Sequence, residues 1–416
     1  MTTKKVGEIF IAGGQPNITY NPRKTHRLEE QLLDYLDTGY KLLSVTGSTK
    51  SGKTVLSRKV IPLKKGIWVS GGQVQVEDDF WTIILDRLGI PWNYTEENQT
   101  GQSYGTDVSV DGEVSALVAK AKGQFKASRN STSSNKVVHQ YLRSPRTTAI
   151  DALIESKMPL IVDDFHYIHR DIQSKIVRAL KDPIFEGLRV IIIAVPHRAY
   201  DAVRVESEMT GRVSQLQIPL WTDEELKEIP MRGFPELNAH CPNETIVQFV
   251  EESFGSPHLI QDFCLNLCFN NNLREASDSP VFIMEPGDYT NFFKLIAQSA
   301  SKIAFERLAK GPRQRTDRVV REFTDGSKGD IYIAVLKALA LTGPKTEIQY
   351  EEVRSALRSL LIGQVPNANE VTRVLKKMSD IAFEQRDQGE PVIEWVKDDV
   401  LYIADPFFAF YLKWNS

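Results

Sequence analysis

The sequence is poor in cysteine, in net charge and in long apolar runs. It has three cysteines among 416 residues, and its formal net charge is only −3. So few cysteines cannot form a disulfide framework, and they suit a reducing compartment. A net charge this small excludes global attraction to nucleic acid, so any such contact needs a local patch. No apolar run approaches the roughly 20 residues of a membrane-spanning helix or the length of a signal peptide's apolar region, so we expect a cytoplasmic protein without membrane contact.

The length and composition are those of a globular protein with more than one domain. A chain of 416 residues is too long for one ordinary core, and 41% of its residues are hydrophobic and 25% charged. Cys264 and Cys268 lie four apart on a predicted helix. They could share a metal with Cys241 or His258, or they could be small buried side chains. The second reading is favoured, because the sequence has no second pair of ligands at metal-binding spacing.

A glycine-bounded loop near the start of the chain carries the clearest motif. It fits the pattern G-x-x-x-x-G-K-[ST], with a predicted buried strand at 42–45 before it and a predicted helix from Lys53 after it. The glycines permit backbone angles that let the loop N–H groups surround phosphate oxygens. Lys53 is then expected at the β- and γ-phosphates, and the Thr54 hydroxyl on Mg²⁺. The residues expected to contact the nucleotide are Gly47, Ser48, Thr49, Lys50, Ser51, Gly52, Lys53, Thr54 and Val55.

Two acidic residues end a second apolar strand. Asp163 and Asp164 follow the run Leu160-Ile161-Val162. Acids at the end of a buried strand are costly unless they face a ligand or a metal. We predict that Asp163 holds Mg²⁺ and that Asp164 polarises the attacking water of an ATPase. A plain strand-end turn is the alternative. His166 and His169 follow, and we expect them at a solvated helix start, with a nucleotide-sensing role as the alternative.

The rest of the chain changes in character along its length. Strands alternate with helices up to Leu220, which predicts a parallel sheet between helices. Thr222 and Glu225 form a capping box that opens a helical region. Near the C-terminus, three predicted helices precede a hairpin and an aromatic helix, which is a winged-helix pattern. We therefore expect a core at 1–220 with a polar insertion at 94–146, a helical lid at 221–310, a connector at 311–328 and a winged helix at 329–416.

The loop, the Asp163-Asp164 pair and this order of domains resemble the AAA+ superfamily. The resemblance is strongest to its origin-recognition-like and STAND branches (signal-transducing ATPases with numerous domains), and it covers most of the chain. It implies an α/β fold with a P-loop AAA+ parallel-sheet core, an all-helical lid and a C-terminal winged-helix domain. It also implies an ATPase that uses ATP or ADP with Mg²⁺.

The resemblance implies further site residues. Arg212 stands where an arginine finger would reach a neighbouring subunit, which implies self-association; an ordinary surface arginine is the alternative. Pro257 and His258 stand where many AAA+ lids carry an arginine, in a G-x-P pattern similar to the STAND lid, where the proline packs on the base and a histidine reads the β-phosphate. This difference favours a slow switch over a fast motor. His197 or Arg198 would be a polar sensor, and residues 16–23 would pack the adenine.

Two functions are compatible with these residues. The first is a slowly hydrolysing, nucleotide-controlled switch that oligomerises and acts through a separate effector protein, with prokaryotic antiviral defence suggested by analogy. The second is a DNA-binding ATPase similar to origin-recognition or transposition-regulator proteins. The basic residues Arg373, Lys376 and Lys377 on the third winged-helix helix make DNA contact possible, although the modest charge favours packing within the protein. A non-hydrolysing scaffold is a weaker third class.

Overall fold

The computed structural model describes residues 4–91, 144–195, 211–312, 318–343, 345, 347–384, 391–396 and 400–415. The chain forms two compact units. The sheet unit contains residues 26–47 and 56–218, and the lid unit contains residues 1–25, 48–55 and 219–416. The predicted insertion lies outside the described residues except for its last three positions.

The sheet unit is built on a five-stranded parallel sheet with the order β2-β3-β4-β1-β5. Strands β1, β3 and β4 are apolar along their whole length, apart from Ser44, Thr46 and Asp163, because helices cover both faces of the sheet. The strand bounds are Leu42–Thr46 (β1), Ile67–Ser70 (β2), Leu160–Asp163 (β3), Val190–Ala194 (β4) and Val213–Gln217 (β5).

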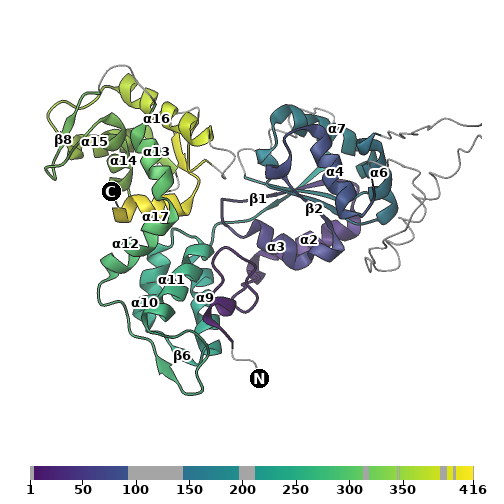
Figure 1. Cartoon of the computed structure of the whole chain (residues 1–416), viewed down its shortest axis with the longest axis horizontal. Coiled ribbons are helices and arrows are strands. Elements are labelled where there is room, and N and C mark those ends of the chain that lie inside the picture. The colour runs from purple at the N-terminus through teal and green to yellow at the C-terminus, as the bar shows by residue number, and fades with distance from the viewer. Residues whose placement is uncertain are drawn as a thin grey trace, which may run out of the picture. The chain divides into compact units, whose positions relative to one another are not determined.

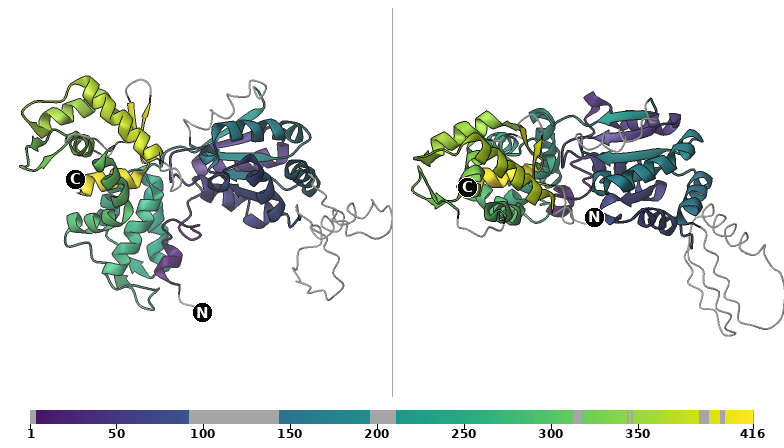
Figure 2. Two further views of the ribbon diagram at one scale, coloured as in Figure 1. Left: turned by 45° about the horizontal axis from the view of Figure 1, so that its top comes forward. Right: turned by 90° about the horizontal axis from the view of Figure 1, so that it is seen from above.

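Helices lie on both faces of this sheet (Figure 2). Helices α2 and α3 bury Leu32 and Leu56 against the alternate strand residues Leu43 and Val45. Helices α4, α6 and α7 cover the other face, where Trp81 is fully buried. The bounds are Leu28–Thr38 (α2), Lys53–Val60 (α3), Glu77–Arg87 (α4), Pro145–Ser156 (α6) and Arg170–Phe185 (α7), with short turns at Lys24–His26, Leu63–Lys65, Gly71–Gln73 and Phe165–Tyr167.

The first part of the lid unit is a helical core that also holds the start of the chain. Val6, Ile9 and Phe10 are buried in the same apolar cluster as Phe263 and Phe293. The sequence prediction grouped these first residues with the sheet, whereas the structure packs them here. The bounds are Val6–Ile9 (α1), Asp223–Glu236 (α9), Asn243–Glu252 (α10), Pro257–Asn270 (α11) and Tyr289–Ala300 (α12), with the paired strands Ala239–His240 (β6) and Val281–Phe282 (β7).

The second part of the lid unit has the predicted helix order followed by a hairpin. Asn367 caps its third helix by accepting from the Glu370 N–H at 2.9 Å. The bounds are Lys302–Lys310 (α13), Arg321–Phe323 (β8), Lys328–Gly329 (β9), Ile331–Leu341 (α14), Glu347–Gln349 (β10), Tyr350–Leu360 (α15), Leu361–Ile362 (β11), Ala368–Phe383 (α16), Ile393–Val396 (β12), Val400–Ile403 (β13) and Pro406–Asn415 (α17).

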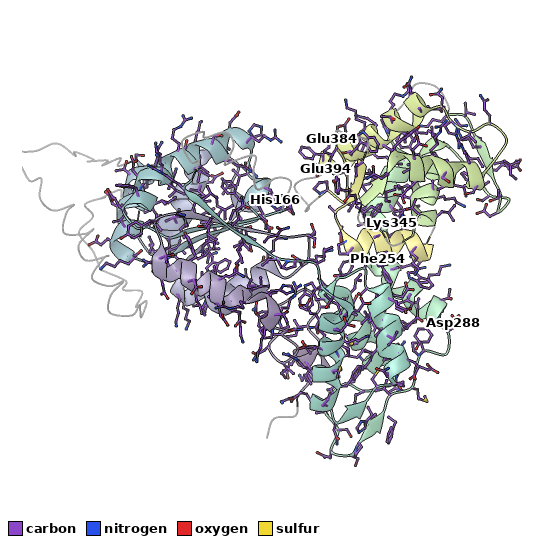
Figure 3. The ribbon with its side chains drawn as sticks, turned by 180° about the vertical axis from the view of Figure 1, so that it is seen from behind. His166, Phe254, Asp288, Lys345, Glu384 and Glu394 are labelled. Atoms are coloured by element: carbon purple, nitrogen blue, oxygen red, sulfur yellow. The ribbon has the colours of Figure 1, made fainter. Side chains whose placement is uncertain are left out.

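Helix α17 belongs to both cores of the lid unit (Figure 1). Phe407, Phe410 and Tyr411 pack into the first core, while Phe408 and Leu412 pack into the second. Figure 3 shows Phe254 beside this helix, and its ring centroid lies 6.3 Å from that of Phe410. An aromatic helix that is buried from Pro406 to Leu412 therefore joins the lid helices to the winged helix.

The structure differs from the sequence prediction in three local features. The lid is not purely helical, because β6 and β7 pair as a short parallel ladder. The predicted helix at 288–310 is two helices, interrupted at Ser301, whose φ of −143° is not helical. Part of the predicted connector forms β8, which pairs with β11 of the following domain. None of the described helices is long and apolar enough to span a membrane.

Candidate nucleotide-binding site

The glycine-bounded loop leaves the carboxyl end of β1 and enters α3 at Lys53. Gly52 has φ +94°, a left-handed conformation that favours glycine, and a Cβ there would meet nothing within 4 Å. Glycine is therefore required for its backbone angle and not for space. The Ser51 N–H donates to the Ser48 carbonyl at 3.2 Å, and the Lys53 ammonium donates to the same carbonyl at 2.7 Å. The strand, loop and helix thus occur in the predicted order.

Two hydroxyl groups of the loop indicate that the loop is suited to bind a phosphate. The side-chain oxygens of Thr49 and Ser51 are buried and have no hydrogen-bond partner within the described residues. A buried hydroxyl without a partner costs free energy unless a ligand or water supplies one. Lys53, two residues after Ser51, is also buried, with 8% of its surface exposed. Hydroxyls, a lysine and a helix N-terminus are the groups that bind phosphate oxygens, so these residues fit a nucleotide polyphosphate.

The loop is held by partners from distant parts of the lid unit. The Trp221 indole N–H donates to the Ser51 carbonyl at 2.9 Å, and the Gln15 amide donates to the Val55 carbonyl at 3.0 Å. The Lys50 ammonium lies 2.8 Å from the Asp405 carboxylate. The motif identified the loop, but it carried no signal for these partners, because the Lys50–Asp405 pair is 355 residues apart.

Asp163 and Asp164 lie at the carboxyl end of β3. Asp163 is opposite Ser70 in the parallel register, and its Oδ1 accepts from the Asp164 N–H at 3.1 Å. Asp164 has φ +53°, so the chain turns sharply after the strand. A Cβ added to Gly71 would lie 2.2 Å from the Asp164 carbonyl oxygen. Gly71 therefore lets the end of β2 approach the acidic turn closely, a role that no motif in the sequence marks.

The histidines after the acidic pair differ in environment. His166 is only 4% exposed, so the expectation of a solvated position is wrong for it; Figure 3 shows it in the sheet unit. It lies in the turn after Asp164, beside the Tyr167 ring at 4.4 Å between centroids. His169 is exposed, as expected, with its Nδ1 3.8 Å from Asp171.

Arg212 lies at the amino edge of the sheet. It precedes Val213, which is opposite Leu42, the first residue of β1. Its guanidinium lies 5.8 Å from the centroid of the exposed Phe185 ring. The loop begins at Gly47, beyond the other end of the strand, and five strand residues span about 16 Å. Arg212 is therefore placed away from the start of its own loop. The predicted sensors His197 and Arg198 lie outside the described residues.

Pro257 and His258 begin α11, where the Ser256 side chain caps the helix by accepting from the Leu259 N–H. The His258 ring packs edge-on against Phe407, with 4.7 Å between centroids. Burial, together with the neighbouring Lys50 charge, lowers the pKa of His258 to about 4 against the opposing effect of Asp405. The imidazole is therefore neutral at neutral pH.

The segment expected to pack the adenine is tied to the first lid helix. Arg23 is buried, and its guanidinium donates to the Pro219 and Leu220 carbonyls at 2.9 and 2.7 Å. The same group lies 2.8 Å from the Glu225 carboxylate and 4.7 Å from the Trp221 ring centroid. These contacts fix the end of the 16–23 segment beside the tryptophan that holds the loop.

The cysteines show no metal site. Cys264 and Cys268 are buried, and within the described residues no group of His, Cys, Asp or Glu could by itself hold a metal ion. Burial raises the pKa of the Cys268 thiol to about 12. The favoured reading, small buried side chains, agrees with these observations. Magnesium bound with a nucleotide takes most of its oxygen ligands from phosphate and water, so such a site does not need a cluster of protein ligands.

The third winged-helix helix carries a modest basic face. Arg373 and Lys376 are exposed, and Lys377 lies 3.6 Å from Asp380. A shallow hollow of about 570 Å³ lies at the start of this helix. Glu370, which lines the hollow, is paired with Arg321 at 2.8 Å. Acidic neighbours thus offset part of the basic charge.

Comparison with known proteins establishes the fold. No protein-family model and no curated protein matches the chain. Among solved structures, the Walker-type ATPase PABY2304 of Pyrococcus abyssi matches 95% of this chain and 96% of its own at a TM-score of 0.54 and 16% identity. The Orc1 protein of Aeropyrum pernix, solved in complex with DNA, matches 99% and 96% at a TM-score of 0.46 and 13% identity. The match to PABY2304 shows that the chain has the fold of that Walker-type ATPase along nearly its whole length, in agreement with the predicted fold class.

A STAND protein with a tetratricopeptide repeat sensor, PH0952 of Pyrococcus horikoshii, is also similar, at a TM-score of 0.36 and 14% identity. The match covers 92% of this chain and 41% of that one.

Proposed function

We propose that the protein is an ATPase that binds ATP or ADP with Mg²⁺ at the glycine-bounded loop. The observation that carries this proposal is the pair of buried, unpartnered hydroxyls, Thr49 and Ser51, in a loop that also contains Lys53. Lys53 would neutralise phosphate charge, and the Thr54 hydroxyl would bind Mg²⁺. The bound metal would polarise the phosphate and offset its developing charge during transfer.

Asp163 and Asp164 are the proposed acids of this reaction. Strands β1 and β3 are both parallel to β4, so their carboxyl ends lie at the same edge of the sheet. Ligands of open parallel sheets bind at that edge. Asp163 would hold a magnesium-bound water, and Asp164 would orient the attacking water. Its sharp left-handed turn supports a functional role, because such backbone angles persist where the surroundings impose them.

The test separates binding from hydrolysis. Titration with a fluorescent ATP analogue should show magnesium-dependent binding that Lys53→Ala abolishes and that Lys59→Ala, an exposed lysine on the same helix, leaves unchanged. Asp164→Asn should bind ATP normally and lose phosphate release. Equal binding by Lys53→Ala and the unchanged protein would refute the site. Normal turnover by Asp164→Asn would refute the assigned acid.

We propose further that the nucleotide controls assembly and that hydrolysis is slow. By the resemblance, Pro257 and His258 stand where many AAA+ lids carry an arginine, and this difference favours a slow switch over a fast motor. The histidine is neutral and packed against Phe407. Arg212 lies away from the start of its own loop, which suits a role at a neighbouring subunit's nucleotide. Light scattering with ADP, ATP and a slowly hydrolysed analogue should give different masses; one mass in every condition would contradict the switch.

The biological setting follows from the resemblance to the STAND branch. We propose a cytoplasmic role in prokaryotic antiviral defence, in which a separate effector protein is engaged in the ATP-bound state. Co-purification of a genetic neighbour with the Asp164→Asn variant in ATP, and not in ADP, would support this role.

A DNA-binding ATPase is the second candidate, and the exposed Arg373 and Lys376 favour it. Salt-dependent duplex binding should then weaken when these residues and Lys377 are neutralised.

A further inference from the structure

Lys50 occupies a backbone conformation that disfavours lysine. Its φ is +59°, in the left-handed region that non-glycine residues rarely adopt. Gly52, two residues on, has a positive φ as well, and there the residue is glycine. A side chain kept at such a position costs stability, and positions of this kind cluster at functional sites. The lysine at position 50 therefore calls for an explanation in terms of what its side chain contacts.

The Lys50 side chain reaches the start of the last helix. Its ammonium lies 2.8 Å from Asp405 Oδ1 and 3.9 Å from the centroid of the Phe407 ring. The pair is partly shielded from solvent, with side-chain exposures of 30% for Lys50 and 17% for Asp405. Asp405 Oδ1 also accepts from the Phe407 N–H at 2.9 Å, which fixes the carboxylate in place. A loop expected to bind phosphate thus already has an anionic partner from the winged-helix domain.

The surroundings leave Lys50 as the countercharge of this acid. His258 packs edge-on against Phe407 and is neutral, so it offers Asp405 no positive charge. A Cβ on Gly13 would lie 3.2 Å from the His258 ring, so the imidazole is confined on that side too. Among the described residues, Lys50 is the cation paired with Asp405.

We propose that Asp405 is a specificity-determining residue of the nucleotide site, which acts through Lys50 to favour the diphosphate over the triphosphate. The inference rests on the proposed function, because it needs nucleotide at the loop. Phosphate oxygens and the Asp405 carboxylate compete for one ammonium group. ATP carries more negative charge than ADP and gains more from a free ammonium, so an ammonium held by Asp405 is a larger loss for ATP than for ADP. A nucleotide that takes Lys50 from Asp405 also removes a contact of the winged-helix domain.

The experiment is a double-variant cycle read by nucleotide affinity. Kd values for ADP and ATP are measured for the unchanged protein, Asp405→Asn, Lys50→Met and the double variant, with Asp380→Asn as an acidic control on α16. We expect Asp405→Asn to tighten ATP binding about fivefold more than ADP binding. A change of this size is what the loss of one partly exposed ion pair would produce. In the Lys50→Met background this preference should fall to less than about twofold.

Several outcomes would overturn the inference. Equal changes for ADP and ATP in Asp405→Asn would show that the acid does not discriminate. The full effect in the Lys50→Met background would show that it does not act through the lysine. Lys50→Gly provides a variant that removes the side chain and relieves the left-handed backbone; it should fold at least as stably and show the same changed preference as Lys50→Met.

The same titration distinguishes this inference from the proposed function. If the unchanged protein and Lys53→Ala bind nucleotide equally well or not at all, the nucleotide site itself is wrong and the inference falls with it. If Lys53→Ala abolishes binding but the cycle shows no coupling, only the role of Asp405 is wrong.

Discussion

Replacement of Gly71 by alanine tests the assignment of the acidic turn most directly. The new Cβ would lie 2.2 Å from the Asp164 carbonyl oxygen, 2.9 Å from its carbonyl carbon and 3.3 Å from the Asp163 carbonyl oxygen. All of these atoms belong to the backbone, so no side-chain rotation can relieve the contact. Ordinary contacts begin near 3.4 Å, so the turn must move away from β2 by about 1 Å.

The expected magnitude follows from this displacement. A misplacement of about 1 Å at a catalytic group can lower turnover about 100-fold. Overpacking of this kind also costs about 1–3 kcal/mol of unfolding free energy. ATP affinity should change much less, because the residues proposed to bind phosphate are in the loop at 47–54.

Gly72 provides the matched control for this prediction. A Cβ at Gly72 would meet only the Tyr167 ring at 3.8 Å and the Ser70 hydroxyl at 3.9 Å, which are ordinary contacts. Phosphate release, ATP binding and thermal unfolding are measured for both alanine variants. Normal turnover in a folded Gly71→Ala protein would refute the argument that this turn positions the catalytic acid. A loss in Gly72→Ala as large as that in Gly71→Ala would show that the effect is not due to the close contact.

Three further predictions concern other parts of the molecule. Glu252 is buried and accepts from the Lys413 ammonium at 2.7 Å, so Glu252→Gln should lower the unfolding free energy by about 2 kcal/mol in denaturant titrations. Glu251 is exposed, so Glu251→Gln is the control. Equal stability of the Glu252→Gln and Glu251→Gln proteins would contradict the role of the Glu252–Lys413 pair. The folded protein lowers the pKa of His258 from 6.5 to about 4, so folding disfavours its protonated form; its contribution to stability is complete above pH 6.5 and is lost as the pH falls towards 4. The difference in unfolding free energy between the unchanged protein and His258→Gln should follow that curve, and a difference that is constant with pH would show that the pKa is not shifted. Arg212→Ala should leave ATP affinity unchanged and lower turnover about 1,000-fold, if it serves a neighbouring subunit; unchanged turnover would make it an ordinary surface arginine.

The elements with a strong local signal were predictable from the sequence. Strands β1, β3 and β4 are continuous apolar runs because both faces of the sheet are covered, and this pattern is readable without a structure. The capping box of Thr222 and Glu225 forms as expected, with the Thr222 hydroxyl accepting from the Glu225 N–H. The hairpin and aromatic helix at the C-terminus were also predicted, since their composition determines burial.

The features that were not predictable depend on long-range contacts. The burial of His166 is decided by packing around the acidic turn, and no local pattern reports it. The break at Ser301 has no glycine or proline to mark it. The close approach of Gly71 to Asp164 requires that β2 and β3 be neighbours, an order that the chain sequence alone leaves open. The Lys50–Asp405 pair likewise requires knowledge of which helix meets the loop.

The two ends of α17 explain why the loop and the lid should respond to nucleotide together. At its start, Asp405 holds Lys50, and at its end Lys413 and Trp414 both donate to the buried carboxylate of Glu252. Between these ends the helix is buried in both apolar cores of the lid unit, so it cannot move without disturbing both. A phosphate that takes Lys50 from Asp405 therefore removes a charge contact from a helix that the rest of the unit holds rigidly. Such a helix would transmit the change as a shift of packed elements rather than absorb it locally.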